Sequence, residues 1–581
     1  MKMIIQFMKD YKKESILAPL FKMLEALLEL FVPLVVAQII DRGIYYGDKR
    51  YIISMCLVMF LLAAIGLAFS LTAQYFAAKS AVGASTAMRS KLFAHIQSFG
   101  YEEMDRIGSA TLITRMTSDI NQVQNGINMA LRLFLRSPFV VIGSVVMAFT
   151  IDFKAALIFV VTVPVLAIVL FTVMAVTKPI YKNVQNSLDR ILNITRENLT
   201  GVRVIRAFHQ EKNEKETFFA ANDELTGFQK FAGKISGLSN PMTFIIINFA
   251  IIVLVYVGAI RVNAGSLSQG EVVALYNYMS QILVELVKFA NLIVTITKAL
   301  ASVNRIGDIF EMSPKMKAGE TLIEINKTGD SQLEETVPMV EFRDVSFGYH
   351  ESGEAAISHI SFRAKRGETI GIIGGTGSGK STLVNLIPRF YDATDGMVLL
   401  NGKNVKEISF EELRTKIAVV PQKAQLFAGT IGSNLRLGFP EATEEDLEEA
   451  LKVSQAKEFV DAKAGRLDAV VEQGGRNLSG GQKQRLTLAR ALVRKSEILI
   501  MDDSASALDY ATDANLRKAI REMNHKPTVF IVSQRASSIL NADQIIVLDD
   551  GKVAGIGNHE FLLESCDVYR EIYETQFKKE A

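Results

Sequence analysis

Six apolar stretches, each near the ~20 residues that a helix needs to cross a bilayer, constrain this chain more than any other feature. We expect spanning helices at roughly 17–40, 51–78, 131–152, 155–177, 240–262 and 272–297. Nearly all the long apolar runs lie before about residue 300, so the 49% hydrophobic content is unevenly distributed. Because 581 residues are too many for one compact domain, the sequence predicts a membrane domain followed by at least one other domain.

The connections between the predicted spans alternate in length. About fifty residues separate the second span from the third, and about sixty separate the fourth from the fifth, whereas the segment 151–154 is very short. The long connections contain few Gly or Pro residues, so we expect the spanning helices to continue beyond the membrane. A continuation of about 25 residues extends nearly 40 Å at ~1.5 Å per residue. We expect each pair of extensions to end in a short turn that contacts a cytoplasmic domain.

An even number of spans places both chain ends on one side of the membrane. Four cations before the first span favour the cytoplasm: Lys2, Lys9, Lys12 and Lys13. Three in the first external loop oppose this: Arg42, Lys49 and Arg50. Apolar residues recur at helical spacing opposite the first lysines, at Ile4, Phe7, Met8 and Tyr11. They predict an amphipathic helix on the inner leaflet, with a disordered start as the alternative.

Composition excludes several classes of protein. A formal net charge of +2 does not indicate a nucleic-acid partner. The two cysteines, Cys56 and Cys566, cannot form a disulfide framework and have no metal-ligand spacing around them. No cleavable signal peptide is visible at the start of the sequence.

The second half of the chain has a different pattern. Residues 313–337 are polar, charged and weakly periodic, which is typical of a linker. We therefore divide the chain into a membrane domain at 1–312, the linker, and a domain at 338–581. In the last of these, short β-branched strands alternate with helices, which predicts an α/β domain with a mainly parallel sheet.

A phosphate-binding motif lies in this domain. The expected strand Thr369–Ile373 leads into G-x-x-x-x-G-K-S and then a helix. The residues that we expect to surround the phosphates are Gly374, Gly375, Thr376, Gly377, Ser378, Gly379, Lys380, Ser381 and Thr382. Their backbone N–H groups can face an anion at a helix N-terminus. Lys380 is expected to contact the β- and γ-phosphates of ATP, and Ser381 to provide an oxygen to Mg²⁺.

An apolar strand at 496–501 ends in Asp502. A carboxylate at the tip of a buried strand, beside a phosphate loop, is placed to organise Mg²⁺.

The segment Leu478–Gln482 (LSGGQ) resembles the signature motif of ATP-binding cassette (ABC) proteins. In that family two cassettes enclose ATP, and the signature of one holds the γ-phosphate bound by the other, here through Ser479, Gly480, Gly481 and Gln482. The resemblance covers essentially the whole chain, because 198–208 is similar to the second cytoplasmic loop of ABC exporters. It implies three further site residues: Tyr349 stacks on adenine, Gln422 belongs to the Q-loop and contacts Mg²⁺, and Asp509 ends a D-loop that begins at Ser506.

Two catalytic positions depart from the family pattern. Asp503 stands where the family has a glutamate base, and Gln534 where it has a switch histidine; Gln473 also replaces a glutamate common in exporters. Asp is one methylene shorter than Glu, and such a misplacement can cost on the order of 10²-fold in rate. The intact signature then suggests a heterodimer whose partner carries the glutamate and the histidine. A homodimer with two slow sites is the alternative.

Charges also occur inside the expected spans. Glu25 and Glu29 lie four apart, and intramembrane carboxylates are costly enough to suggest function. They either line a cavity that favours cationic amphiphiles, or pair with residues on neighbouring helices, or lie where water enters. Glu285 and Lys288, three apart, are expected to neutralise each other. Arg132 and Arg136 are expected to extend to lipid headgroups.

Taken with the resemblance, the sequence predicts an all-α six-helix transmembrane domain with long cytoplasmic extensions, followed by an α/β P-loop cassette. The expected function is ATP-driven export of hydrophobic or amphipathic compounds, with ATP and Mg²⁺ as cofactors and membrane lipids as surroundings. Both termini and the cassette are expected to be cytoplasmic. An ATP-gated regulatory or channel-like protein and a homodimeric lipid or peptide exporter are the alternatives.

Overall fold

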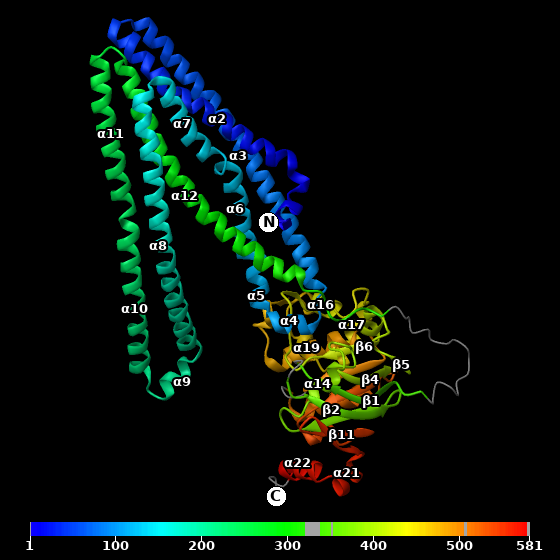
Figure 1. Cartoon of the computed structure of the whole chain (residues 1–581). Coiled ribbons are helices and arrows are strands. Elements are labelled where there is room, and N and C mark those ends of the chain that lie inside the picture. The colour runs from blue at the N-terminus through cyan, green and yellow to red at the C-terminus, as the bar shows by residue number, and fades with distance from the viewer. Residues whose placement is uncertain (1, 320–336, 350–352, 505–507, 578–581) are drawn as a thin grey trace. The chain divides into compact units, whose positions relative to one another are not determined.

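The computed structural model describes residues 2–319, 337–349, 353–504 and 508–577. The chain forms two compact units (Figure 1). One comprises Met1–Gln97 and Gly108–Met312, and the other comprises Ser98–Ile107 and Ser313–Ala581. The first unit ends at Met312, and the short segment 98–107 belongs to the second unit. Most of the predicted linker lies outside the described residues.

The first unit is helical. Six stretches in the described residues are long and apolar enough to cross a membrane, which confirms the predicted number: Lys9–Ile44, Lys49–Gln97, Ser109–Ile151, Phe153–Thr200, Glu211–Asn263 and Gln269–Glu311. Helices suit such segments because hydrocarbon offers no hydrogen bonds, so the backbone must satisfy its own. The chain is therefore a multi-pass membrane protein.

The helical elements of this unit run in sequence order with three short non-α segments between them. The helices are α1 (Lys2–Phe7), α2 (Lys12–Gln38), α3 (Lys49–Gln97), α5 (Ser109–Thr114), α6 (Ile120–Leu133), α7 (Arg136–Ile151), α8 (Phe153–Thr200), α9 (Val202–Ala207), α10 (Glu211–Gly237), α11 (Ser239–Asn263) and α12 (Gln269–Glu311). The 3₁₀ segment η1 (Lys9–Tyr11) and the π-helical segments η2 (Ile39–Ile44) and η3 (Arg115–Asp119) connect them.

Two helices continue far beyond the thickness of a bilayer, as the loop lengths predict. Helix α3 has 49 residues and α8 has 48, which corresponds to about 70 Å each. Figure 1 shows α8 and α10 side by side, with α9 at their end. A small apolar cluster of Ile191, Ala221 and Leu225 joins these two helices. The second long connection is therefore a helical pair that carries a short helix at its tip.

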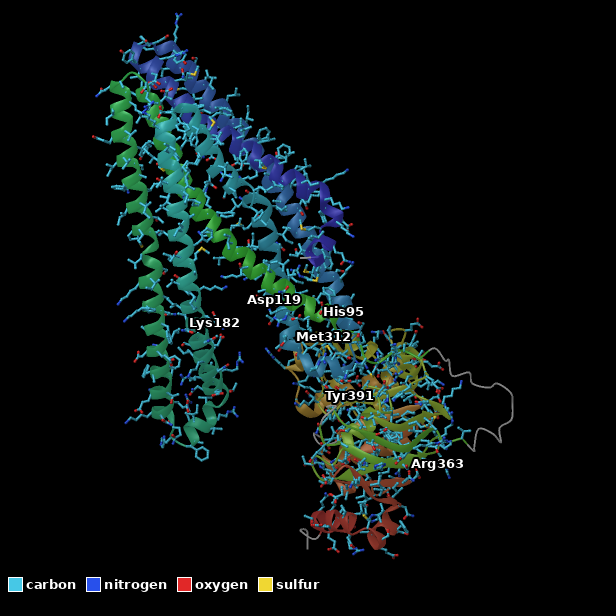
Figure 2. The ribbon with its side chains drawn as sticks, viewed as in Figure 1. His95, Asp119, Lys182, Met312, Arg363 and Tyr391 are labelled. Carbon is cyan, nitrogen blue, oxygen red and sulfur yellow. The ribbon has the colours of Figure 1, made fainter. Side chains whose placement is uncertain are left out.

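Polar contacts join the ends of the other extensions. The ring of His95, in α3, lies 2.9 Å from the carbonyl oxygen of Met312 at the end of α12 (Figure 2). Asp119 is buried and accepts hydrogen bonds from Arg305 and from Ser302, the latter at 2.9 Å. These contacts tie α3, α12 and the α5–α6 region into one bundle.

The third span is not one continuous helix. Helix α6 ends at Leu133 and α7 begins at Arg136. Pro138, in the first turn of α7, has no N–H to donate to the carbonyl of Phe134, so the proline favours an interruption here.

The N-terminal segment differs from the expectation of a lipid-facing helix. The ring of Phe7 is buried, with its centroid 6.2 Å from that of Phe310 in α12, and Lys91 of α3 lies over its face. The Tyr11 ring occupies the space beside Gly83, where a Cβ would lie 2.1 Å from it. Part of the apolar face therefore packs on the protein, because α3 and α12 provide aromatic and glycine surfaces that bury it.

The second unit is an α/β domain, which confirms the predicted class. Its strands are β1 (Val340–Phe347), β2 (Ile357–Ala364), β3 (Thr369–Gly374), β4 (Asp395–Leu400), β5 (Lys403–Asn404), β6 (Ile417–Val420), β7 (Gly429–Thr430), β8 (Val470–Val471), β9 (Ile498–Asp502), β10 (Thr528–Val532), β11 (Gln544–Asp549) and β12 (Lys552–Gly557). Its helices are α4 (Tyr101–Ile107), α14 (Lys380–Asn385), α15 (Phe410–Lys416), α16 (Ile431–Arg436), α17 (Glu444–Val453), α18 (Lys457–Asp461), α19 (Gly480–Leu492), α20 (Tyr510–Arg521), α21 (His559–Ser565) and α22 (Asp567–Phe577).

The central sheet positions the site. Its order is β12-β11-β3-β10-β9-β6, with all pairs parallel except β11 with β12. Val532 of β10 is paired with Ile372 of β3 on one side and with Asp502 of β9 on the other. The carboxyl ends of β3 and β9 therefore reach the same edge of the sheet, where ligands bind in open α/β folds. A four-stranded antiparallel sheet, β2-β1-β4-β5, and a two-stranded sheet, β7-β8, complete the unit.

Helix α4 is held in the second unit by aromatic and polar contacts. The Tyr101 ring stacks on Phe390 with centroids 4.4 Å apart, and the Tyr391 hydroxyl donates to Asp105 at 2.6 Å. Figure 2 labels Tyr391. Burial, together with the nearby carboxylate, raises the pKa of Tyr391 well above its usual value. Glu103 is buried and accepts from the backbone N–H of Lys315 at 3.0 Å. The tip of the first long connection is thus part of the α/β unit.

Candidate nucleotide-binding site

A cleft of about 390 Å³ opens at the carboxyl edge of the central sheet. It brings together most of the residues that the motifs predict, and its lining consists of Tyr349, Ala356, Thr376, Gly377, Gly379, Lys380, Ser381, Thr382, Gln422, Asp502, Asp503, Val532, Ser533 and Gln534. Gly374, Gly375 and Ser378 belong to the same loop but are not among the lining residues. A cleft of this volume is large enough for a nucleotide.

The phosphate loop has the backbone geometry that its glycines permit. Gly379 has φ +90°, and a Cβ there would lie 2.7 Å from the carbonyl oxygen of Ala356. A larger residue would therefore be strained and would clash. Helix α14 begins directly afterwards at Lys380, so its free N–H groups face the cleft.

Lys380 is nearly buried beneath the loop. Its Nζ donates to the carbonyl oxygens of Gly374 at 3.0 Å and Gly375 at 2.5 Å, and lies 3.3 Å from the Ser378 hydroxyl. Burial lowers the pKa of this ammonium, while Asp503 and Asp502 oppose that shift. The loop oxygens hold the cation beneath the position where phosphates would lie.

Ser381 and Asp502 form the candidate Mg²⁺ site. The Ser381 hydroxyl donates to Asp502 Oδ1 at 2.9 Å, and Asp502 is buried. Burial raises the pKa of the Asp502 carboxyl, and Asp503 adds to this, while the Ser381 bond and Lys380 act against it. Two hard oxygens suit Mg²⁺, which binds to few protein ligands and completes its shell with phosphates and water. No cluster of three His, Cys, Asp or Glu suited to a metal occurs in the described residues.

The two unusual residues lie in the same cleft. Asp503 has φ +44°, and its Oδ2 accepts from Gln422 Nε2 at 3.4 Å. Gln534, two residues after the end of β10, lines the cleft, and its backbone oxygen accepts a hydrogen bond from Gln576 at 2.8 Å. The positions that the motif resemblance assigns to a base and a switch residue are therefore occupied by an aspartate and by an amide that does not titrate.

Tyr349 provides an aromatic surface at the rim. Its hydroxyl lies 2.9 Å from that of Thr382, and its ring packs edge-on against Phe347 and Tyr391. With 43% of the residue exposed, part of the ring can accept a stacked base.

The signature residues do not line this cleft. Ser479 is the exposed N-cap of α19, where its hydroxyl accepts from Gln482 N at 3.3 Å and Gln482 Oε1 accepts from Ser479 N at 3.1 Å. This capping box leaves the start of the helix, with Gly480 and Gly481, open to a ligand outside the unit. Asp509 is likewise an N-cap, of α20, where bonds from Thr512 lower the pKa of its carboxyl. In the predicted D-loop, Leu508 is buried, and positions 506 and 507 lie outside the described residues.

Sequence reasoning missed three lining residues, Ala356, Val532 and Ser533. The last two directly precede Gln534 at the end of the apolar strand β10, so that strand pattern could have identified them. Ala356 carries no sequence signal and lines the cleft because β2 begins beside the phosphate loop.

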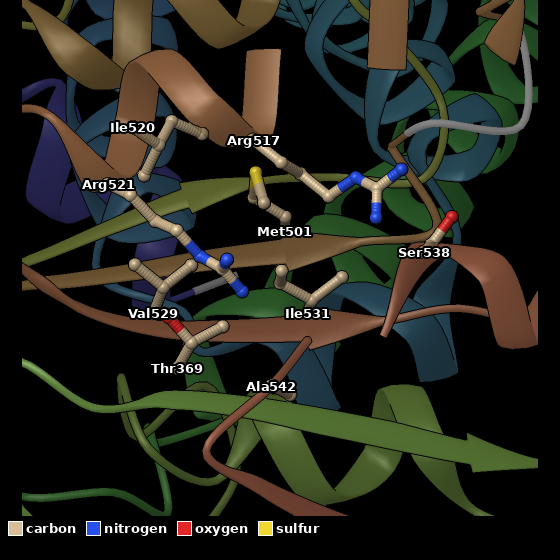
Figure 3. A pocket seen from close by; sticks show the side chains of 9 residues that line it. All are labelled: Thr369, Met501, Arg517, Ile520, Arg521, Val529, Ile531, Ser538 and Ala542. Atoms are coloured by element: carbon tan, nitrogen blue, oxygen red, sulfur yellow. The ribbon is translucent and has the colours of Figure 1, made fainter. Parts of the chain in front are cut away.

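A second cavity in this unit is too small for such a role. It lies between α20 and the central sheet and has a volume of about 20 Å³ (Figure 3). Its arginines are engaged, since Arg517 donates to the Ser537 carbonyl at 2.8 Å and Arg521 donates to that of Asn541. A space of this size holds about one water molecule.

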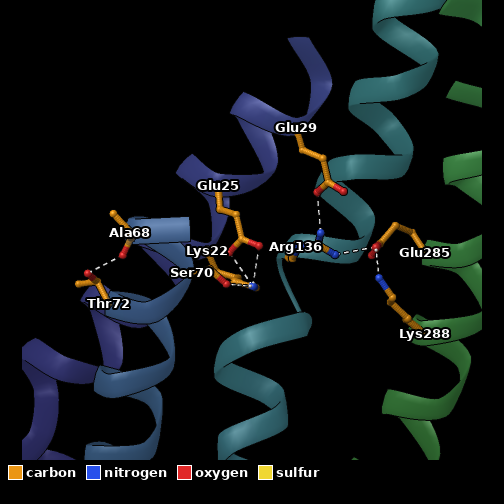
Figure 4. A network of polar contacts seen from close by, with 9 residues as sticks. All are labelled: Lys22, Glu25, Glu29, Ala68, Ser70, Thr72, Arg136, Glu285 and Lys288. Carbon is orange, nitrogen blue, oxygen red and sulfur yellow. Dashed lines mark hydrogen bonds and ion pairs between the residues drawn. The ribbon is translucent and has the colours of Figure 1, made fainter. Parts of the chain in front are cut away.

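The charged residues of the membrane half form pairs (Figure 4). Lys22 bonds both oxygens of Glu25, at 2.8 and 2.6 Å, and the expected pair of Lys288 with Glu285 forms at 2.8 Å. Arg136 differs from the expectation of a headgroup contact. It is buried and donates to Glu29 and Glu285, each at 2.6 Å, because two carboxylates from other helices meet it at the α6–α7 break. Arg132 is half-buried and has no ion pair in the described part of the chain.

Comparison with known proteins finds relatives that are similar to this chain over nearly its whole length. Residues 15–286 match the family described as the ABC transporter transmembrane region, and 357–506 match the ABC transporter family. An uncharacterized ABC transporter ATP-binding protein of Bacillus subtilis, YfiB, is 36% identical over 100% of this chain and 99% of its own length. An ATP-dependent lipid A-core flippase of Vibrio vulnificus is 28% identical over 98% of this chain and 96% of its own length. A bacterial Atm1-family ABC exporter with ATP bound has the same fold, with a TM-score of 0.79, 22% identity, and coverage of 97% of this chain and 98% of that one.

Proposed function

We propose that this chain, which belongs to the ABC transporter family, is one subunit of a heterodimeric exporter of hydrophobic or amphipathic compounds. The observation that carries the proposal is the content of the cleft. Asp503 and Gln534 line it together with the phosphate loop and Asp502, while the signature at Ser479–Gln482 is intact and exposed. A family member with this combination can bind ATP well and hydrolyse it slowly at its own site.

The binding step follows from the residues of the cleft. The N–H groups of the phosphate loop and Lys380 would hold the β- and γ-phosphates, and Tyr349 would stack on adenine. Ser381, Asp502 and Gln422 would hold Mg²⁺, which when bound neutralises charge that develops on the phosphates. The hydrogen bond from Ser381 to Asp502 keeps both oxygens turned toward each other before nucleotide arrives.

The hydrolytic step is where this chain is weak. The Asp503 carboxylate is about 1.5 Å shorter in reach than that of a glutamate, so it polarises an attacking water poorly. Gln534 can donate a hydrogen bond to a γ-phosphate, but it cannot carry a proton as an imidazole does. The site is therefore suited to holding ATP and keeping two cassettes together.

The signature would serve the partner's site. The N-terminus of α19 carries the positive end of a helix dipole and an exposed hydroxyl, so it can bind the γ-phosphate of ATP held by another cassette. The active site of the complex would then combine the partner's glutamate and histidine with Ser479 of this chain.

Transmission to the membrane half would use the helices at the tips of the extensions. Helix α4 is already held in the α/β unit. Val204 in α9 and Phe208 directly after it are exposed, at 60% and 71%. The α/β unit has a groove of about 520 Å³, lined in part by Val419, Phe427 and Leu437, which could receive the α9 of a partner subunit. In this arrangement the helical unit lies in the cell membrane, and the cassette and both termini are cytoplasmic.

The substrate class follows from the membrane half and from the relatives. An apolar groove of about 590 Å³ lies between α8 and α11, lined by residues such as Leu157, Val161 and Phe249. A relative is a lipid A-core flippase. We therefore propose lipid-like or multidrug amphiphiles as cargo.

The test uses the complex that a tag on this chain co-purifies. The partner should be a different chain with Glu and His at the two positions. Glu→Gln in that chain should reduce steady-state ATPase activity at least ~10²-fold, while Asp503→Asn should reduce it less than about twofold. Equal, near-complete losses would show that Asp503 is a working base and would refute the degenerate-site assignment. Recovery of this chain alone would support a homodimer instead.

The signature provides a matched pair of variants. Ser479→Arg should remove most ATPase activity, whereas the same change at the partner's signature serine, which faces the slow site, should remove much less. Uphill efflux from vesicles that contain the complex distinguishes an exporter from an ATP-gated channel, which dissipates gradients only.

A further inference from the structure

Four charged residues from three spanning helices form a connected node in the membrane half (Figure 4). Arg136 of α7 lies at its centre and bonds Glu29 of α2 and Glu285 of α12. Glu285 also accepts from Lys288 at 2.8 Å and from the Ser137 hydroxyl at 2.9 Å. Two cations and two carboxylates balance, so the node has no net charge.

The node has a buried centre and two exposed ends. The side chains of Arg136 and Glu285 are 7% and 2% exposed, whereas those of Glu29 and Lys288 are 43% and 45% exposed. Three hydrogen bonds connect the two ends, which places their charges within roughly 10 Å of each other. The node therefore presents one anionic and one cationic group at a short separation.

Both ends retain hydrogen-bonding capacity. Among the described residues, Glu29 accepts one hydrogen bond, from Arg136, and a carboxylate can accept about four. Lys288 donates one of its three protons, to Glu285. Arg136 also has a buried Nε with no hydrogen-bond partner in the described part of the chain, so its guanidinium is not saturated.

The surroundings restrict what can meet these ends. Charged side chains in spanning helices rarely face lipid and almost always face a water-filled cavity or another part of the protein. Arg136 bonds residues of two other helices, so the node lies where α2, α7 and α12 meet. A ligand that reaches the two half-exposed ends meets a carboxylate and an ammonium.

Both oxygens of Glu25 are held by Lys22, which argues against a cationic ligand on that carboxylate. Glu29 accepts one hydrogen bond, from Arg136, and its side chain is 43% exposed, so it can take a further cation. We infer that Glu29 and Lys288 bind the zwitterionic headgroup of an amphipathic substrate, with its ammonium on Glu29 and its anionic group on Lys288. The inference rests on the proposed export function and names the substrate class for it.

A binding experiment tests this without ATP turnover. The complex in dodecyl maltoside micelles is titrated with three tritiated probes that have the same twelve-carbon chain: dodecylphosphocholine, dodecyltrimethylammonium and dodecanoate. Two ionic contacts instead of one should make dodecylphosphocholine bind about tenfold more tightly than either other probe. Equal affinities, or preference for a singly charged probe, would overturn the inference.

The two ends should respond differently to substitution. Glu29→Gln should weaken the binding of dodecylphosphocholine and dodecyltrimethylammonium about tenfold and leave the binding of dodecanoate unchanged. Lys288→Gln should weaken the binding of dodecylphosphocholine and dodecanoate and leave that of dodecyltrimethylammonium unchanged. Glu14→Gln is the matched control, because it removes another carboxylate of α2, one that pairs with Lys79 outside the node. It should change the affinity of none of the three probes. Equal weakening of all three probes by both node variants would indicate a structural role and contradict the assignment.

Two further arms separate the remaining possibilities. A two-chain phosphatidylcholine that competes as well as the single-chain probe identifies a membrane lipid as the source of the headgroup, and competition by the single-chain probe alone identifies a smaller amphiphile. Both support the inference. Vesicle efflux of a neutral hydrophobic dye is measured with the same purified complex after its reconstitution into lipid vesicles. Efflux without headgroup preference refutes this inference only, whereas headgroup preference without efflux refutes the export function only.

Discussion

Replacement of Lys380 by methionine tests whether the cleft binds nucleotide through this residue. Methionine keeps an apolar stem of similar length but removes the ammonium that the loop carbonyls hold. A buried charge-assisted hydrogen bond contributes about 1.5–3 kcal/mol. Its loss should weaken ATP binding at this site roughly 10- to 150-fold.

The assay must report each chain separately, because the complex contains two ATP sites. Radiolabelled azido-ATP is crosslinked at 4 °C, a temperature chosen to limit turnover, and the two chains are then resolved on a gel. Label on this chain should require far more nucleotide in Lys380→Met, while label on the partner changes little. Lys552→Met, an exposed lysine on β12 of the same unit, is the control and should bind ATP normally. Unchanged labelling of this chain in Lys380→Met would refute the assignment.

The same lysine predicts a dependence on pH. Because burial lowers the pKa of Lys380, its neutral form appears at a lower pH than that of an exposed lysine. The ammonium is the form that attracts phosphate, so ATP affinity at this site should fall as the pH is raised through that pKa. Lys380→Met should abolish this fall, and a slope that survives in the variant would assign it to another group.

Two more predictions concern packing and docking. Gly126→Ala would place a Cβ 2.3 Å from that of Ala299. Despite the better helix propensity of alanine, the substitution should therefore destabilise the α6–α12 contact by about 1–3 kcal/mol. Thermal unfolding of the purified complex measures this loss, and Gly66→Ala, where no atom lies within 4 Å, is the control. Tyr391→Phe keeps the ring but removes the hydrogen bond to Asp105. The loss of this bond, about 0.5–1.5 kcal/mol, should accelerate amide hydrogen exchange in residues 98–107 roughly two- to tenfold. Unchanged exchange would show that the Tyr101–Phe390 stack alone holds α4.

Motifs with short sequence spacing were predictable, because their geometry is local. The phosphate loop from Gly374 to Ser381 needs only a strand, glycines and a helix start in succession. The proximity of Ser381 to Asp502 is not local, since it depends on β10 lying between β3 and β9. The motif resemblance provided that arrangement, and strand spacing alone could not. Pro138 was a visible signal for the break in the third span, but it lay in an apolar run that read as one helix.

The position of α4 was predictable only in kind. Loop lengths indicated a short element at the tip of the first long connection, and the structure has one at Tyr101–Ile107. Its partners Phe390 and Tyr391 lie almost three hundred residues further along the sequence. Aromatic and carboxylate residues of this kind are common on surfaces, so nothing in either segment identifies the other.

The membrane charges show most directly where sequence spacing stops being informative. Glu285 and Lys288 are three residues apart, and helix geometry alone brings them together. Arg136 pairs with residues 107 and 149 positions away, and those pairs exist only if α2, α7 and α12 present the right faces to one another. A buried charge that loses its partner is strongly destabilising, by about 3–5 kcal/mol. The ion pairs therefore help to fix how the three helices are rotated about their axes, just as helix packing brings the paired residues together. The sequence position of Arg136 suggests a headgroup contact, but its pairs help to determine how the bundle assembles.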